Sequence, residues 1–174
     1  MRGGDTMKTM MKFILLFTKI SMVGQDSINL RFIEKINTLR SSKDLKLLQY
    51  DERLYPVAMK WAKYITNRLN KYPTDSIIIN HKRDMLFTHV NYNKRFNEIL
   101  KRKDVKSVSE NLHFIMDTDS GVDFVDESFV AWQKSIYHYE SMLDTNNNIA
   151  FGYYCDKATK RLLSIIVLTE EQKK

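Results

Sequence analysis

The sequence predicts an α+β domain, more specifically a three-layer α-β-α sandwich in which a small antiparallel sheet lies between helices. Two observations predict it. The first is a pair of amphipathic helical patterns, over residues 54–69 and 129–143. The second is a pair of consecutive β-rich segments, residues 149–154 and 162–168, joined by a short polar connection. Helices that bury one stripe against a sheet form layered architectures of this kind.

The first two dozen residues differ in composition from the rest. Lys8 and Lys12 precede an apolar run over residues 13–17, and Lys19 interrupts the apolar segment. A charged start followed by an apolar run is typical of a secretory signal peptide. We predict that residues 1–24 form a signal peptide or N-terminal anchor, with a soluble extension as the alternative. Residues 27–170 are then expected to fold as one domain, because no repeat or linker divides them.

Two helices are expected in the first half of this domain. The first ends near Ser41, and its apolar residues recur at helical spacing: Phe32, Ile33, Ile36 and Leu39. In the second, Asp51 is the expected N-cap, Pro56 is tolerated in the first turn, and Pro73 marks the end. Its apolar stripe is continuous and makes it the best-defined element: Leu54, Val57, Ala58, Trp61, Ala62, Ile65 and Leu69.

The middle of the chain is less periodic. Residues 77–79 favour a short strand, residues 84–89 a short helix and residues 95–100 a further helical turn or two. Beyond them, either Asp123 or Asp126 is expected to cap one continuous helix. Its expected buried face consists of Phe129, Trp132, Ile136, Tyr139 and Leu143. A hairpin then follows from the two β-rich segments.

Charge and cysteine content exclude several classes. The formal charge of +7 and a pI near 9.4 invite a nucleic-acid interpretation, but the basic residues are spread along the chain and the densest run, residues 101–103, is short. Nucleic acid is therefore not expected as a partner. A single cysteine, Cys155, excludes an internal disulfide. The acidic segment from Asp117 lacks the glycine and glutamate of a calcium-binding EF-hand loop, so a solvated loop is expected there.

Three separated residues carry the chemistry: His89, Glu110 and His138. Two neutral imidazoles and a carboxylate suit Zn²⁺, at about 2.0 to 2.1 Å for the nitrogen ligands, and leave a position open for water. Ser135 and His138 are three apart and would share one face of a continuous helix. A metal-free alternative is equally supported: the histidines hydrogen-bond Glu110 and nearby backbone and tie the helices to the sheet.

The order and spacing of these pieces, over residues 28–168, resemble the CAP superfamily, also called the SCP-like extracellular domain. The resemblance is carried by Asn37 and Arg40, Leu48-x-x-Asp51-x-x-Leu54-x-x-x-Ala58-x-x-Trp61-Ala62, His89, Glu110-Asn111-Leu112, Trp132-x-x-Ser135-x-x-His138 and Gly152. The shortage of cysteines is similar to the compact bacterial-type members.

This resemblance implies an α-β-α sandwich with a cleft that holds two histidines and up to two acidic residues. By position, His89 and His138 are the histidines and Glu110 is one acid, whereas Ser135 stands where many relatives have the second acid. The expected function is a secreted or cell-surface binding module whose cleft takes a divalent metal, a small or lipid-like ligand, or a protein partner. The alternative is a metal-dependent, peptidase-like hydrolase that uses Glu110 as general base.

Overall fold

A computed structural model describes residues 23–73, 92–121 and 123–172 of the chain. Its helices are α2 (Val23–Ser41), α3 (Tyr55–Leu69), α5 (Tyr92–Leu100), α6 (Phe124–Lys134) and α7 (Ile136–Leu143), with a 3₁₀ turn η2 (Thr118–Ser120). Its strands are β1 (Gln49–Tyr50), β2 (Val105–Ile115), β3 (Asn148–Asp156) and β4 (Arg161–Glu171). The expected strand at 77–79, the short helix at 84–89 and the proposed leader up to residue 22 lie outside the described residues.

The four strands form one sheet in the order β1-β3-β4-β2. The predicted hairpin is confirmed: β3 and β4 pair antiparallel from Asn148 opposite Thr169 to Asp156 opposite Arg161. Strand β2 pairs antiparallel with the other side of β4. The short β1 pairs in parallel with β3, so the sheet is mixed at this edge. A tight turn can join only antiparallel strands, but a long segment connects β1 to β3, so these two strands can run in parallel.

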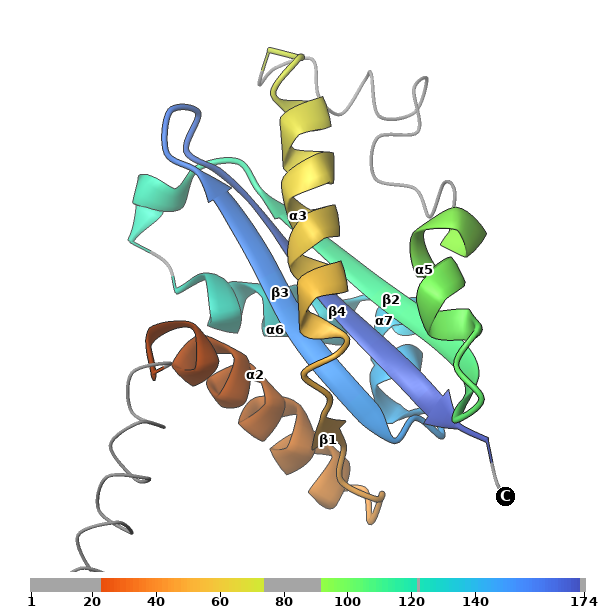
Figure 1. The fold of residues 1–174 in the computed structure, drawn as a ribbon. Coiled ribbons are helices and arrows are strands. Elements are labelled where there is room, and N and C mark those ends of the chain that lie inside the picture. The colour runs from red at the N-terminus through yellow and green to blue at the C-terminus, as the bar shows by residue number, and fades with distance from the viewer. Residues whose placement is uncertain (1–22, 74–91, 122, 173–174) are drawn as a thin grey trace, which may run out of the picture.

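Helices cover both faces of the sheet, which confirms the three-layer prediction. Figure 1 shows α3 and α5 on the near face, with α2, α6 and α7 on the other. The alternation of side chains along β4 divides the core in the same way. Leu163, Ile165 and Val167 join a cluster with α3 and α5, whereas Ile166 and Leu168 join a cluster with Phe32 of α2 and Trp132 of α6. β4 is thus buried on both faces, which explains its nearly unbroken apolar sequence.

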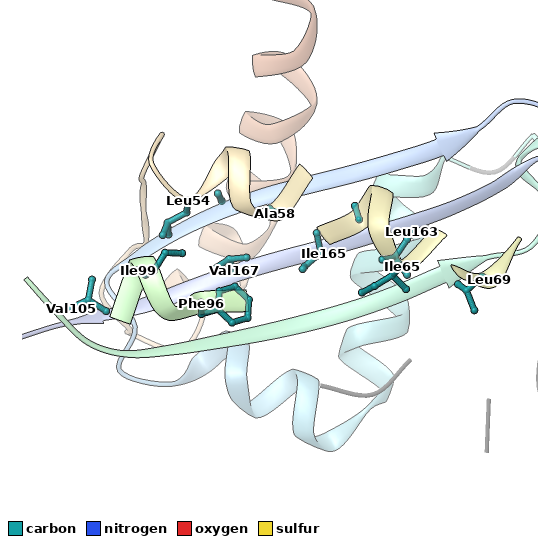
Figure 2. Close-up of a cluster of buried hydrophobic side chains, with 12 residues drawn as sticks. Leu54, Ala58, Ile65, Leu69, Phe96, Ile99, Val105, Leu163, Ile165 and Val167 are labelled. Carbon is teal, nitrogen blue, oxygen red and sulfur yellow. The ribbon is translucent and has the colours of Figure 1, made fainter. Parts of the chain in front are cut away.

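α3 follows its predicted stripe. Figure 2 shows the side chains that it directs at the sheet, among them Leu54, Ala58, Ile65 and Leu69. The prediction of its N-cap was wrong: the cap position is Leu54, with Pro56 in the first turn. The Asp51 carboxylate instead accepts hydrogen bonds from the backbone N–H and the guanidinium of Arg53. Hydrogen bonds between a guanidinium and a carboxylate are charge-assisted and roughly twice as strong as neutral ones.

One long helix was expected after Asp123, and this prediction was wrong in part. Asp123 does cap α6, since its carboxylate accepts from the Val125 and Asp126 N–H groups. However, Ser135 adopts an extended conformation (φ −99°, ψ 118°) that separates α6 from α7. The break leaves Ile136 66% exposed rather than buried. Ser135 and His138 therefore do not share one helical face as expected.

Candidate functional site

The three predicted site residues lie in different parts of the fold. His89 lies outside the described residues. Glu110 is in the middle of β2 and is 5% exposed, and His138 is in the first turn of α7 and is half-buried. The structure therefore tests the surroundings of Glu110 and His138, and not the three-residue set.

Glu110 is paired with Arg95 of α5. Arg95 donates through Nη1 to Oε2 at 2.6 Å and through Nη2 to Oε1, so both carboxylate oxygens are engaged. The two side chains are 2% and 0% exposed. Planar two-point pairs of this kind are the strongest that arginine forms. Because the pair is buried, removing either partner would leave an uncompensated charge in the core.

Aromatic rings enclose this ion pair. The Arg95 guanidinium lies 5.4 Å from the ring centre of Trp61 and 5.3 Å from that of Phe96, within the range of cation–π contacts. The Tyr92 hydroxyl donates to the Val108 carbonyl of the neighbouring strand. Burial, and next the Glu110 charge, raises the pKa of Tyr92 to about 12, so its hydroxyl stays protonated. The surroundings of Glu110 are those of a packed, neutralised core.

His138 is tied to the sheet through the next residue of β2. Asn111, which is buried, donates from Nδ2 to the His138 carbonyl at 3.0 Å and accepts from Ser141 Oγ at 2.7 Å. Ser141 Oγ also lies 3.0 Å from the His138 carbonyl. Adjacent residues of a strand point to opposite faces. Since Glu110 reaches α5 and Asn111 reaches α7, the helix that carries His138 lies across the sheet from the Glu110 carboxylate.

A third histidine lies on the His138 side. His113 of β2 is half-buried, with Nδ1 3.2 Å from Ser128 Oγ, and Ser128 donates in turn to Ser164 of β4 at 2.9 Å. Burial, with a smaller effect of His138, lowers the pKa of His113 below its ordinary value. The two buried serines tie α6 to the sheet.

These contacts decide how the zinc prediction fits the structure. Within residues 23–73, 92–121 and 123–172, no group of three His, Cys, Asp or Glu side chains is placed to hold a metal ion. The guanidinium of Arg95 occupies Glu110 and would repel a dication there. The described residues by themselves therefore do not fit zinc. The full set of His89, Glu110 and His138 stays a prediction because His89 is not described.

The main contact missed from the sequence is Arg95. It precedes Ile99 by four residues, so it lies on the apolar face of α5 together with a buried side chain. A basic residue on an apolar helical face is expected to have a buried acidic partner. This signal could have identified Arg95 as the partner of Glu110.

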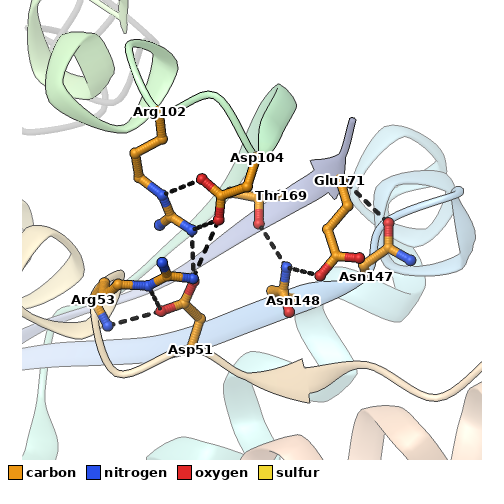
Figure 3. A network of polar contacts seen from close by, with 8 residues as sticks. All are labelled: Asp51, Arg53, Arg102, Asp104, Asn147, Asn148, Thr169 and Glu171. Atoms are coloured by element: carbon orange, nitrogen blue, oxygen red, sulfur yellow. Dashed lines mark hydrogen bonds and ion pairs between the residues drawn. The ribbon is translucent and has the colours of Figure 1, made fainter. Parts of the chain in front are cut away.

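A second polar network joins the turn before α3 to the turn before β2. Figure 3 shows Asp51 between Arg53 and Arg102, with Asp104 on the outer side. Arg102 donates to Asp51 at 3.1 Å and to Asp104 at 2.6 Å. Near Asp104 lies an open surface hollow of about 840 Å³ whose walls carry mixed charge and include neither Glu110 nor His138. The residues that line this open hollow are all charged or polar, whereas small-molecule sites are usually lined by hydrophobic and aromatic side chains.

Comparison with known proteins gives the context of this geometry. The family model of the cysteine-rich secretory protein (CAP) family matches residues 33–169. A search of curated proteins found no match. Within the described residues, no helix is both long and apolar enough to cross a lipid bilayer.

Solved structures share the fold at low sequence identity. An outer surface protein from Borrelia burgdorferi has a TM-score of 0.54 and 16% identity, with 80% of this chain and 90% of that one covered. An extracellular protein with an SCP domain from Bacillus anthracis has a TM-score of 0.56 and 16% identity, and the match covers 83% of this chain and 41% of that one. The venom allergen-like protein 4 of Schistosoma mansoni has a TM-score of 0.51 and 15% identity, and the match covers 82% of this chain and 86% of that one. The predicted resemblance is thus confirmed, and the chain belongs to the CAP (cysteine-rich secretory protein) family.

Proposed function

We propose that this protein is a secreted or cell-surface binding module of the CAP type that binds its ligand without turning it over. An extracellular location is supported by the names of the structural neighbours, which include an outer surface protein and an extracellular protein. A small or lipid-like molecule or a protein partner stays the proposed ligand class.

The observation that carries binding without catalysis is the Arg95–Glu110 pair. A general base must reach the proton that it removes, directly or through one water molecule. Both oxygens of Glu110 are instead held by a guanidinium, and the carboxylate is fully buried. Freeing it would break the pair inside the core, at a cost of about 3–5 kcal/mol. Glu110 therefore suits a structural role that fixes α5 against β2.

The competing function is a zinc-dependent hydrolase with His89, His138 and Glu110 as ligands or base. Calorimetric titration of zinc into the full chain, with His89→Ala and His138→Ala beside it, tests the metal directly. We expect either that zinc does not bind at all or that it still binds at least one of the two variants. Binding lost in both variants would establish a shared metal site at His89 and His138 and would make the hydrolase the stronger candidate.

Turnover is tested separately with a panel of peptide substrates in the presence of zinc. We expect no hydrolysis by the wild type above that of Glu110→Gln, whose folded fraction is checked by circular dichroism. Hydrolysis by the wild type that disappears in a folded Glu110→Gln variant would establish the hydrolase instead.

The proposed location has its own test. Mass spectrometry of protein isolated from the native host is expected to find a processed N-terminus close to residue 24 in the extracellular or surface fraction. An intact N-terminus confined to the interior of the cell would overturn secretion while leaving the binding fold untouched.

A further inference from the structure

The outer face of α3 is basic and carries no acidic residue. From Arg53 to Thr74 the sequence contains no aspartate or glutamate. The apolar side of α3 faces the sheet, and three cationic side chains lie on its exposed or half-exposed positions: Lys60, Lys63 and Arg68. They span about 12 Å of the helix at 1.5 Å per residue. A fourth, the exposed Lys71, lies in the turn that follows the C-cap residue Asn70. We call these four residues the α3 basic stripe.

The α3 basic stripe differs from the other basic groups near it because its charges are not neutralised. Arg53 and Arg102 pair with Asp51 and Asp104, and Lys106 pairs with Glu170. None of the four stripe residues takes part in an ion pair within the described part of the chain. Asp156, at the end of β3, accepts a hydrogen bond from Asn70 at the C-cap of α3 at 2.6 Å. Unpaired charge of one sign is therefore concentrated along one helix.

Aromatic rings alternate with these cations. Lys60 lies 5.7 Å from the ring centre of Trp61, and Arg68 lies 5.9 Å from that of Tyr64. Lys63 lies 5.6 Å from the ring of Tyr154 on β3. Each contact holds a long, otherwise mobile side chain near the surface of the helix. The positive groups are thus partly ordered before any partner binds, which reduces the entropy lost on binding.

From this arrangement we propose that the α3 basic stripe binds a linear acidic polysaccharide, with the cations on its sulfate or carboxylate groups. A straight stripe one helix wide matches a chain-like polyanion, and binding would release counterions from that chain. Tyr64, which is 47% exposed, offers one ring to the apolar face of a sugar. None of the four cations contacts Glu110 or His138, although Trp61 lies between Lys60 and the Arg95 of the Glu110 pair. The inference rests on the proposed function only in assuming a binding module.

Two other polyanions fit the stripe less well. A membrane-surface helix inserts an apolar face into the lipid, but the apolar face of α3 is buried against the sheet and Tyr64 is its single exposed large apolar side chain. Single-stranded nucleic acid binds by stacking successive bases on several free rings. Trp61 and Tyr154 are half-buried here, so Tyr64 alone is exposed.

The experiment is calorimetric titration of the full chain with a heparin oligosaccharide of uniform length at several salt concentrations. The test variant carries Lys60→Gln, Lys63→Gln, Arg68→Gln and Lys71→Gln. The matched control removes the same charge from exposed lysines on other elements that also make no ion pair in the described part of the chain: Lys43→Gln, Lys101→Gln, Lys103→Gln and Lys134→Gln. Circular dichroism and thermal unfolding verify that both variants are folded.

We expect the wild type to bind heparin with an affinity that falls steeply with salt. The stripe variant should bind at least about tenfold more weakly, with a shallower dependence on salt, because up to four counterion-releasing contacts are lost. The control variant should stay within about threefold of the wild type. Equal weakening in both variants, or no wild-type binding, overturns the proposal.

The two competing partners are measured with the same variants. Vesicles of phosphatidylserine and phosphatidylcholine test the membrane, and an oligothymidylate tests single-stranded DNA. Tighter, stripe-dependent binding to either probe than to heparin would reassign the surface to that partner. None of these outcomes depends on zinc or hydrolysis, so this proposal and the proposed function fail separately.

Discussion

Gly152 of β3 lies directly against Ala58 of α3, so closely that a Cβ atom at position 152 would come within 2.7 Å of the Ala58 Cβ and 2.8 Å of its carbonyl carbon. Contacts this short with backbone atoms cannot be relieved by rotating a side chain. α3 therefore approaches the sheet as closely as it does because residue 152 has no side chain.

We expect Gly152→Ala to lower the free energy of unfolding by at least about 1–3 kcal/mol, because α3 must move away from β3. Gly121→Ala is the matched control. Gly121 has a φ of +73° but no atom within 4 Å of an added Cβ, so only the left-handed backbone opposes the change, at about 1 kcal/mol. Denaturant unfolding of both variants gives the comparison. A smaller cost at position 152 than at position 121 would contradict the close packing.

The Arg95–Glu110 pair is expected to be strongly coupled. Arg95→Met and Glu110→Gln should each cost about 3–5 kcal/mol, since each leaves one buried group without its partner. The double variant Arg95→Met/Glu110→Gln should be less destabilised than the sum of the two single changes. A double-mutant cycle in denaturant measures this coupling. Additive effects would show that the two side chains act independently.

His113 predicts a pH dependence of stability. Because burial depresses its pKa in the folded protein, the unfolded chain binds protons more readily between the two pKa values. The stabilising contribution is fully present above the unfolded pKa of about 6.5 and is lost as the pH falls through the folded value. We expect His113→Gln to flatten the fall in the free energy of unfolding between about pH 7.5 and 5.5. An unchanged slope would assign that dependence to other groups.

The network in Figure 3 separates a buried carboxylate from an exposed one. Burial opposes ionisation of Asp51, but hydrogen bonds from Arg53 and Arg102 outweigh it and lower its pKa. We expect Asp51→Asn to cost about 1.5–3 kcal/mol near neutral pH, because it removes charged hydrogen bonds. The cost should shrink as the pH falls below about 4, because the unfolded wild-type chain then protonates Asp51 more readily than the folded protein does.

Asp104→Asn is the control for Asp51→Asn. Hydrogen bonds from Arg102 lower the Asp104 pKa to about 2, but its side chain is 49% exposed, so solvent screens the interaction. A loss under about 1 kcal/mol is expected in the same denaturant experiment. Equal costs for Asp51 and Asp104 would mean that burial does not decide the strength of this network.

Local patterns predicted most of the helices and the hairpin, because each records burial of one face. The stripe of α3 and the apolar run of β4 are of this kind. β2 was missed because it is an edge strand with polar residues on both faces: Lys106, Ser107, Ser109, Glu110, Asn111 and His113. Its pairing with β4 supplies the structure that its own sequence does not indicate. The break at Ser135 was missed because the helical spacing of apolar residues continues past it, whereas its backbone is extended and ends α6.

The sequence by itself determined the family and the three-layer class, because these depend on residue types and their spacing along the chain. Only the tertiary structure decided that Glu110 is held by Arg95 while the helix of His138 lies across the sheet. Likewise, only the fold shows that Lys60, Lys63 and Arg68 make no ion pair with the described residues, whereas Arg53 and Arg102 pair with Asp51. The physical reason is the same in each case. The sequence gives the charge of each side chain, but its hydrogen-bond and ion-pair partners come from distant segments that packing brings together.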